Sequence, residues 1–140
     1  MWINEMGAII KYAQMHIGAQ LHYKVLTVPG YNALYFIRNN EGCNQEALVA
    51  ALHIDKANVA RLVERLEKEG YVLRSVNSQN RREVRLSITE RGSAVWEDFN
   101  ACIQAWSTEL MSNLTDQQRQ SFFVTVQQMA KKAREMEKQG

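Results

Sequence analysis

The fold is decided between Asp55 and Gly92, where the chain reads DKANVARLVERLEKEGYVLRSVNSQNRREVRLSITERG. Four apolar residues early in this stretch repeat at helical spacing, at Val59, Leu62, Val63 and Leu66. Asp55 is suited to cap the N-terminus of such a helix, and Gly70 is suited to end it. We therefore predict an amphipathic helix between Asp55 and Gly70, with one buried face.

After Gly70 the spacing of the apolar residues changes from helical to alternating. Residues 71–73 are typical of a short strand, and residues 84–89 alternate apolar and polar side chains, as a half-buried strand does. The polar, turn-rich and basic run 77–82 lies between the two strands. We expect a β-hairpin here, directly after the helix.

Three helices are predicted before Asp55. Pro29 is tolerated in the first turn of the second helix, and residues 53–54 form a short connector after the third. The first helix is expected from Trp2 to about Lys24. The second is capped by Thr27 and ends at the turn residues 39–42. The third is capped by Asn44 and runs from Gln45 to Leu52.

Two more helices are predicted after the hairpin. Thr89 caps a helix that runs to about Ser112, and Thr115 with Gln118 forms a capping box for the last helix. The predicted fold class is mainly α with a small β-hairpin, in the order of a winged helix-turn-helix. We expect one domain of 140 residues, with the winged lobe at 27–92 and its second helix suited to a DNA major groove.

The composition excludes several classes of protein. Hydrophobic residues make up 46% of the chain, which suits a packed core, and the net charge of +2 alone does not argue for nucleic acid. No run of 18 apolar residues and no signal-peptide pattern is present, so we expect a cytoplasmic protein. Cys43 and Cys102 form no CxxC pair, and no metal-binding or catalytic motif occurs, so we expect reduced thiols, no cofactor and no enzyme activity.

The exposed side of the helix after Asp55 carries side chains that can read bases. Asn pairs with adenine and Arg with guanine, while small alanines let a helix approach closely. These candidates are Lys56, Ala57, Asn58 and Arg61, with Arg65 on the same exposed side. The alternative is an ordinary solvated helix with charge pairs three and four residues apart.

The hairpin adds a local positive charge. Its five arginines and two glutamates give a net charge of +3, which exceeds the net charge of the whole chain. The arginines are Arg74, Arg81, Arg82, Arg85 and Arg91, and the glutamates are Glu83 and Glu90. An arginine at a hairpin tip can enter a narrow minor groove. The alternative is a solubilising loop.

Two runs of the sequence resemble the MarR (multiple antibiotic resistance regulator) family. Residues 55–74 match its "rLveRLekkGlv.R" stretch, and residues 80–92 match its "D.R....LT..G" stretch. The order of elements agrees over nearly all of the chain. The resemblance implies a sequence-specific DNA-binding transcriptional regulator that acts as a repressor on a pseudo-palindromic double-stranded operator.

The resemblance also implies a homodimer. Residues 1–24 and 90–140 would form the helical dimerisation region, because their apolar faces are too exposed to be covered by one chain. An ordinary intramolecular helix pair is the alternative.

The family's DNA contacts carry over residue by residue. The resemblance implies that Arg82 reaches the minor groove and that Arg74 and Arg81 contact phosphate or brace the hairpin. Asn44 and Gln45 would meet the DNA backbone. The major groove would be faced by Lys56, Ala57, Asn58 and Arg61.

Many members of the family respond to small aromatic anions, which the resemblance places between dimer body and DNA lobes. Candidate lining residues are Tyr12, His16, Tyr35 and Trp96, although core packing is the alternative for each. Two competing functions stay open: a winged-helix module that binds another protein, and a redox sensor that uses Cys43.

Asn80 departs from the family pattern, which has an aspartate that pairs with the arginine two residues on. Asn80 can still form a hydrogen bond with Arg82 but no ion pair, so we expect a looser hairpin or an Arg82 freer to meet DNA. We predict that Asn80→Asp changes DNA affinity measurably in titrations at matched salt. Identical binding curves for the two proteins would contradict this.

Overall fold

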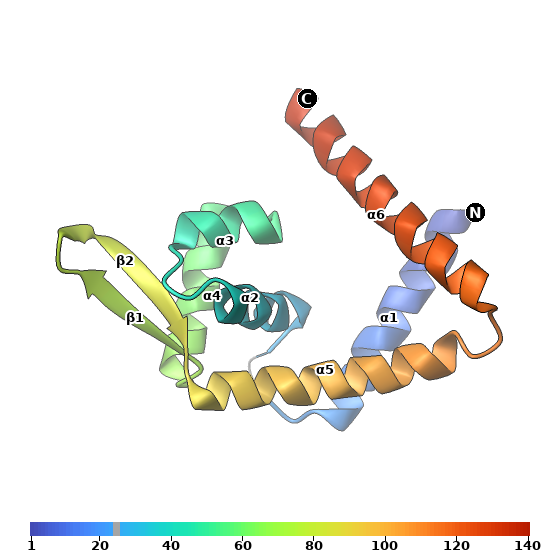
Figure 1. The fold of residues 1–140 in the computed structure, drawn as a ribbon, viewed down its shortest axis with the longest axis horizontal. Helices are drawn as coiled ribbons and strands as arrows, with labels where there is room; N and C mark the ends of the chain where they lie inside the picture. The colour runs from blue at the N-terminus through green and yellow to red at the C-terminus, as the bar shows by residue number, and fades with distance from the viewer. Residues whose placement is uncertain (24–25) are drawn as a thin grey trace. The chain divides into compact units, whose positions relative to one another are not determined.

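The computed structural model describes residues 1–23 and 26–140, which form six helices and one hairpin in these ranges (Figure 1). The elements are α1 (Trp2–Gln20), α2 (Val28–Asn39), α3 (Gln45–Leu52), α4 (Lys56–Lys68), β1 (Val72–Asn77), β2 (Asn80–Ile88), α5 (Glu90–Leu110) and α6 (Asp116–Gln139). The chain divides into two compact units, residues 1–104 and 105–140. The predicted mainly α fold with one hairpin is confirmed.

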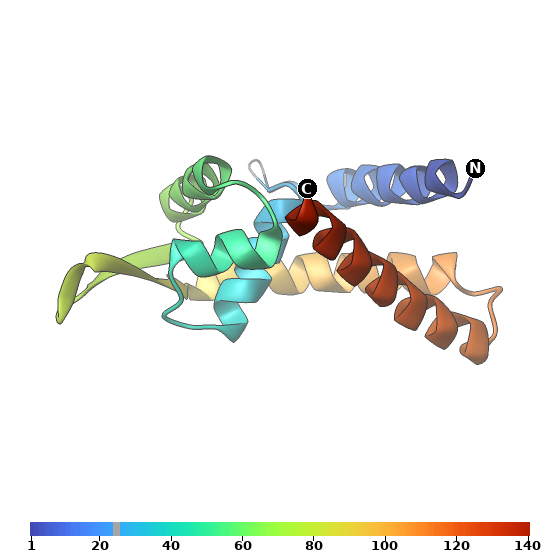
Figure 2. The same ribbon diagram turned by 90° about the horizontal axis from the view of Figure 1, so that it is seen from above.

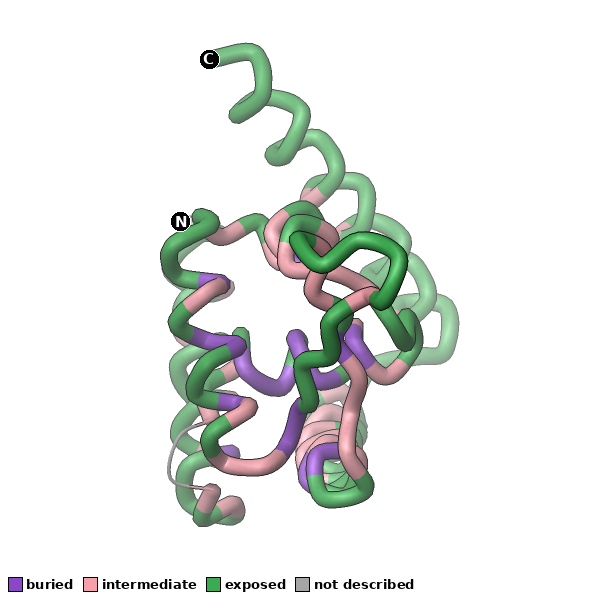
Figure 3. The backbone as a smooth tube through the Cα atoms, turned by 90° about the vertical axis from the view of Figure 1, so that its left-hand side faces the viewer, coloured by how far each residue is buried: buried purple, intermediate pink, exposed green. Residues whose placement is uncertain are grey.

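The core of the first unit lies between α2, α3, α4 and the hairpin (Figure 3). Its side chains include the predicted apolar face of α4, and Leu34, Ile37 and Leu48 are fully buried beside that face. Tyr31 of α2 stacks on Phe99 of α5, with ring centroids 4.1 Å apart, and burial raises the pKa of Tyr31 to about 12. These contacts hold the N-terminal part of α5 against the helix-turn-helix.

Side-chain caps start most of the helices, as predicted. Asn44, Asp55 and Thr115 each accept a hydrogen bond from a backbone N–H three residues on, and Thr115 and Gln118 complete the capping box. Thr89 Oγ1 accepts from the Gly92 N–H at 3.0 Å. Thr27 is different, because it holds the cap position of α2 without a side-chain hydrogen bond.

The first helix is shorter than predicted. It ends at Gln20, because Leu21 has an extended backbone and packs with Tyr23 against the core. The predicted end at Lys24 lies outside the described residues. Helical spacing alone could not locate this end, since the apolar residue Leu21 continues the pattern of α1.

The hairpin is longer and its turn tighter than predicted. β1 and β2 pair antiparallel from Val72–Ile88 to Asn77–Asn80, which leaves residues 78–79 as the turn. The prediction of a loop over 77–82 is therefore wrong, and Arg81 and Arg82 lie on β2. The hairpin projects beyond the helices of the first unit (Figure 2).

A bridge joins the hairpin to the segment after α2. The Leu86 N–H donates to the Cys43 carbonyl at 2.7 Å, and the Gly42 N–H donates to the Leu86 carbonyl at 2.8 Å. Leu86 is itself fully buried. The root of the hairpin is thus fixed to the core while its tip projects.

The second unit contains the end of α5 and the whole of α6. Arg119 closes the turn between them by donating to the carbonyls of Met111 and Leu114, at 3.0 and 2.6 Å. No residue of α6 is buried. Its large apolar side chains are therefore exposed in the single chain. Within the described part of the chain, no helix is long and apolar enough to cross a membrane.

Gly92 sits where α5 starts against the chain that leaves α4. A β-carbon at Gly92 would lie 2.1 Å from the carbonyl oxygen of Tyr71, which is backbone and cannot move aside cheaply. We expect Gly92→Ala to lower the free energy of unfolding by roughly 1–3 kcal/mol in urea denaturation.

Gly18 of α1 is the matched control, because among the described residues no heavy atom apart from its chain neighbours and the backbone of α1 lies within 4 Å of its β-carbon position. There Gly18→Ala should raise stability by about 0.5–1 kcal/mol, through the better helix propensity of alanine. Equal effects of the two substitutions would contradict the close contact at Gly92.

Candidate nucleic-acid interface

The exposed face of α4 carries the predicted base-reading residues. Lys56, Ala57, Asn58 and Arg61 are all exposed, while Val59 between them is fully buried. Asp55 caps the helix, which fixes the first turn on which three of these side chains lie. The amphipathic pattern thus decides which side chains remain available to a partner.

A chain of hydrogen bonds links three side chains on this face. Asp55 Oδ2 accepts from Asn58 Nδ2 at 2.5 Å, and Asn58 Oδ1 accepts from Arg61 Nη2 at 2.7 Å. Bonds from the backbone and side chain of Asn58 hold the pKa of the Asp55 carboxyl below its usual value. Sequence reasoning placed Asp55 as a cap and missed its second bond.

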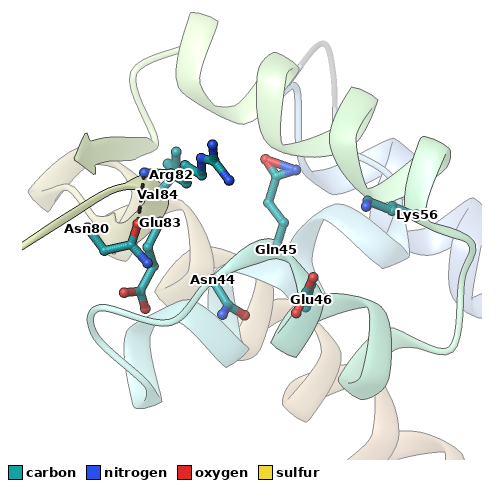
Figure 4. A pocket seen from close by; sticks show the side chains of 8 residues that line it. All are labelled: Asn44, Gln45, Glu46, Lys56, Asn80, Arg82, Glu83 and Val84. Atoms are coloured by element: carbon teal, nitrogen blue, oxygen red, sulfur yellow. Dashed lines mark hydrogen bonds between the residues drawn. The ribbon is translucent and has the colours of Figure 1, made fainter. Parts of the chain in front are cut away.

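The projecting hairpin carries arginines without partners. Among the described residues, the guanidinium groups of Arg81, Arg82 and Arg85 have no hydrogen bond or ion pair, and all three are exposed. The Arg82 backbone N–H donates to Asn80 Oδ1 at 3.2 Å, as the dashed line in Figure 4 shows. Asn80 therefore bonds the backbone of Arg82 and leaves its charged group free.

Arg74 serves as a brace. Its Nε and Nη2 donate to the two carboxylate oxygens of Glu67, each at 3.0 Å, and so tie β1 to the last turns of α4. The same hydrogen bonds lower the pKa of Glu67 and raise that of Arg74. Arg91 lies over the Tyr71 ring, 5.2 Å from its centroid. Arg74 was predicted either to contact phosphate or to brace the hairpin, and its bonds to Glu67 are those of a brace.

A hollow of about 360 Å³ lies between the hairpin and the N-terminal ends of α3 and α4 (Figure 4). It brings together five of the residues predicted to bind DNA, from three separate parts of the sequence, namely Asn44, Gln45, Lys56, Asn80 and Arg82. Glu46, Glu83 and Val84 also line it, and sequence reasoning did not select them. Arg65, in contrast, lies in the last turns of α4 and does not line this hollow.

The predicted ligand residues separate into two groups. Tyr35 and Trp96 stack with ring centroids 5.3 Å apart, and Tyr35 also lines a hollow of about 440 Å³ at the α3–α4 turn. Tyr12 lies exposed on α1, and His16 is half-buried one helical turn further along. The structure thus brings Tyr35 and Trp96 together.

Two charged residues adjoin this aromatic pair. Arg38 lies over the Trp96 ring at 4.8 Å and forms a 2.6 Å ion pair with Glu97. Sequence reasoning missed both, because contacts between α2 and α5 leave no signal in the spacing of either helix.

The two cysteines are half-buried free thiols. Burial raises the pKa of both Cys43 and Cys102, which disfavours the reactive thiolate. The bridge of Cys43 to Leu86 packs its side chain against the core. Among the described residues, no three His, Cys, Asp or Glu side chains gather as metal ligands.

Comparison with known proteins gives consistent matches. The model of the MarR family matches residues 26–84. The HTH-type transcriptional regulator BilQ of Clostridium symbiosum is 29% identical over 101 residues, which cover 70% of each chain. The crystal structure of MarR is 26% identical with a TM-score of 0.81, covering 98% of this chain and 93% of that one.

One further likeness concerns the fold alone. The PcaV transcriptional regulator from Streptomyces coelicolor, in complex with its natural ligand, is 19% identical with a TM-score of 0.79. The likeness covers 91% of this chain and 90% of that chain.

Proposed function

Since the chain belongs to the MarR family of transcriptional regulators, we propose that it is a homodimeric repressor that a small aromatic anion releases from DNA. Members of this family are DNA-binding regulators and not enzymes. The proposed target is a pseudo-palindromic double-stranded site, with one winged lobe, residues 27–92, on each half.

The proposed DNA contacts are supported by the guanidinium groups on β2 that have no partner among the described residues. Arg81 and Arg82 project with the hairpin, whereas Arg74 is held by Glu67. We assign Arg82 to the minor groove, where the negative potential is strong, and Arg81 to phosphate. Asn44 and Gln45, which line the same hollow as Lys56 and Arg82, are assigned to the DNA backbone.

We expect Arg82→Ala to weaken binding to every duplex tested, because it removes a charge without a base contact. The slope of log affinity against log salt should fall by about 2, since each protomer contributes one arginine worth about 1. Fluorescence anisotropy titrations from low to moderate salt measure this slope.

Lys138→Ala, at the end of α6, is the control and should leave the slope unchanged. A slope that Arg82→Ala does not alter would exclude Arg82 from the interface. If the unaltered protein retards no duplex, including its own upstream region, the winged-helix protein-interaction module replaces the proposed function.

The homodimer is supported by apolar surface that the single chain leaves exposed. Monomeric proteins rarely expose large contiguous apolar patches. The exposed residues lie on α1 (Trp2, Ile3, Ile9 and Ile10) and on α6 (Phe122, Phe123, Met129 and Met136). We propose that α1, α5 and α6 form the dimer region, over residues 1–24 and 90–140.

We expect Phe123→Glu to weaken the dimer at least about tenfold, because it would place a charge in an apolar interface. Sedimentation equilibrium over a range of protein concentrations gives the dissociation constant. Gln128→Glu adds the same charge to an exposed polar position of α6 and should have little effect. A monomeric unaltered chain at all concentrations would contradict the homodimer.

Release by a small aromatic anion is supported by the exposed Tyr35 ring stacked on Trp96, with Arg38 beside it. An aromatic ring can stack on Tyr35, and a carboxylate can meet a guanidinium. PcaV, whose fold this chain shares, was solved with its natural ligand. Genome-wide selection of bound DNA, with and without phenolic carboxylates, tests both the operator and the release.

A further inference from the structure

The hydrogen-bonded chain on α4 occupies both ends of the Asn58 amide. Its Nδ2 donates to Asp55 Oδ2 at 2.5 Å, and its Oδ1 accepts from Arg61 Nη2 at 2.7 Å. An asparagine that reads adenine uses these same two atoms together, as donor and acceptor. In this structure both atoms already have a partner on the helix, so the amide is held in place, and only the second N–H of Nδ2 and the second lone pair of Oδ1 remain for a base.

Arg61 is in the opposite situation. Only its Nη2 donates to Asn58, so the other N–H groups of the planar guanidinium remain available. The side chain is exposed on the face of α4 that the buried stripe leaves open. Paired N–H groups in one plane match the O6 and N7 atoms of guanine.

We propose that Asp55 and Asn58 are positioning residues that orient Arg61 to read a guanine, and that Asn58 itself selects no base. This inference rests on the proposed function and assigns the base specificity within it. The two oxygens of Asp55 divide the work. Oδ1 caps the helix through the Asn58 N–H at 2.8 Å, and Oδ2 holds the Asn58 side chain.

The advantage of this arrangement is preorganisation. An arginine side chain on a helix surface samples many rotamers, and ordering it on binding opposes association. A hydrogen bond from Nη2 to a fixed amide restricts those rotamers before DNA arrives. The Asp55 carboxylate accepts from Nδ2 and so keeps the amide oriented with its oxygen toward Arg61.

Asp55→Ser separates the two tasks of the carboxylate. Serine caps a helix about as well as aspartate, but its single oxygen cannot hold the Asn58 side chain as well. The variants to compare with the unaltered protein are Asp55→Ser, Asn58→Ala and Arg61→Ala. Asp116→Ser removes a similar carboxylate, which pairs with Arg119 on the first turn of α6, and serves as the control.

The experiment selects bound duplexes from a random pool and then measures affinity for the preferred site and its single substitutions, at one salt concentration. All three variants should lose preference at the same guanine, by about tenfold for Arg61→Ala and about threefold for the other two. The double variant Asp55→Ser/Asn58→Ala should lose no more than Asn58→Ala alone. The control should keep the preference intact.

Two results would overturn the inference while the proposed function stands. One is a loss of base preference in Asn58→Ala at a base pair different from the one affected by Arg61→Ala, which would show that Asn58 itself contacts a base. The other is an unchanged preference in Asp55→Ser. Absence of binding by the unaltered protein would instead remove both the inference and the proposed function.

A measurement without DNA checks the positioning itself. The side-chain amide resonances of Asn58, followed by NMR, should shift in Asp55→Ser while the thermal midpoint stays within a few degrees. Unshifted resonances would contradict the bond to Asp55. This readout distinguishes loss of positioning from loss of the helix.

Discussion

Burial of one face of α4 is the constraint on which the rest of the structure depends. Val59, Leu62, Val63 and Leu66 all enter the core, so the rotation of the helix about its axis is fixed. That rotation leaves Lys56, Asn58 and Arg61 outside, in a fixed order along the surface. The apolar stripe therefore sets the candidate interface as well as the fold.

The position of the hairpin also depends on the core and on α4, because two sets of contacts attach it to them. Its root is held by the bridge between Cys43 and the buried Leu86, and its first strand is held to α4 by the ion pair of Arg74 and Glu67. Between these anchors Thr89 donates to the Gly70 carbonyl and caps α5. The orientation of the hairpin relative to α4 is thus built from short contacts near its base.

The sequence predicted the elements well because their signals are local. Asn44, Asp55 and Thr115 each cap a helix that starts at the next residue, and Gln45–Leu52 was predicted to the residue. The hairpin turn and the end of α1 were wrong by several residues, since strand pairing and core packing override polarity and spacing there. The partners Glu67–Arg74 and Trp96–Arg38 join different elements and could not be seen in a linear pattern. The base-reading assignment of the candidate site stays a prediction.

The concentration of charge in the hairpin region makes the chain electrically polar. The net charge of residues 74–91 is +3, whereas the net charge of the whole chain is +2. The remaining residues together therefore carry a small net negative charge. A polyanion therefore attracts this segment and weakly repels the rest of the chain, over a distance set by the ionic strength. The attraction of a polyanion is therefore strongest at the segment that holds Arg81 and Arg82.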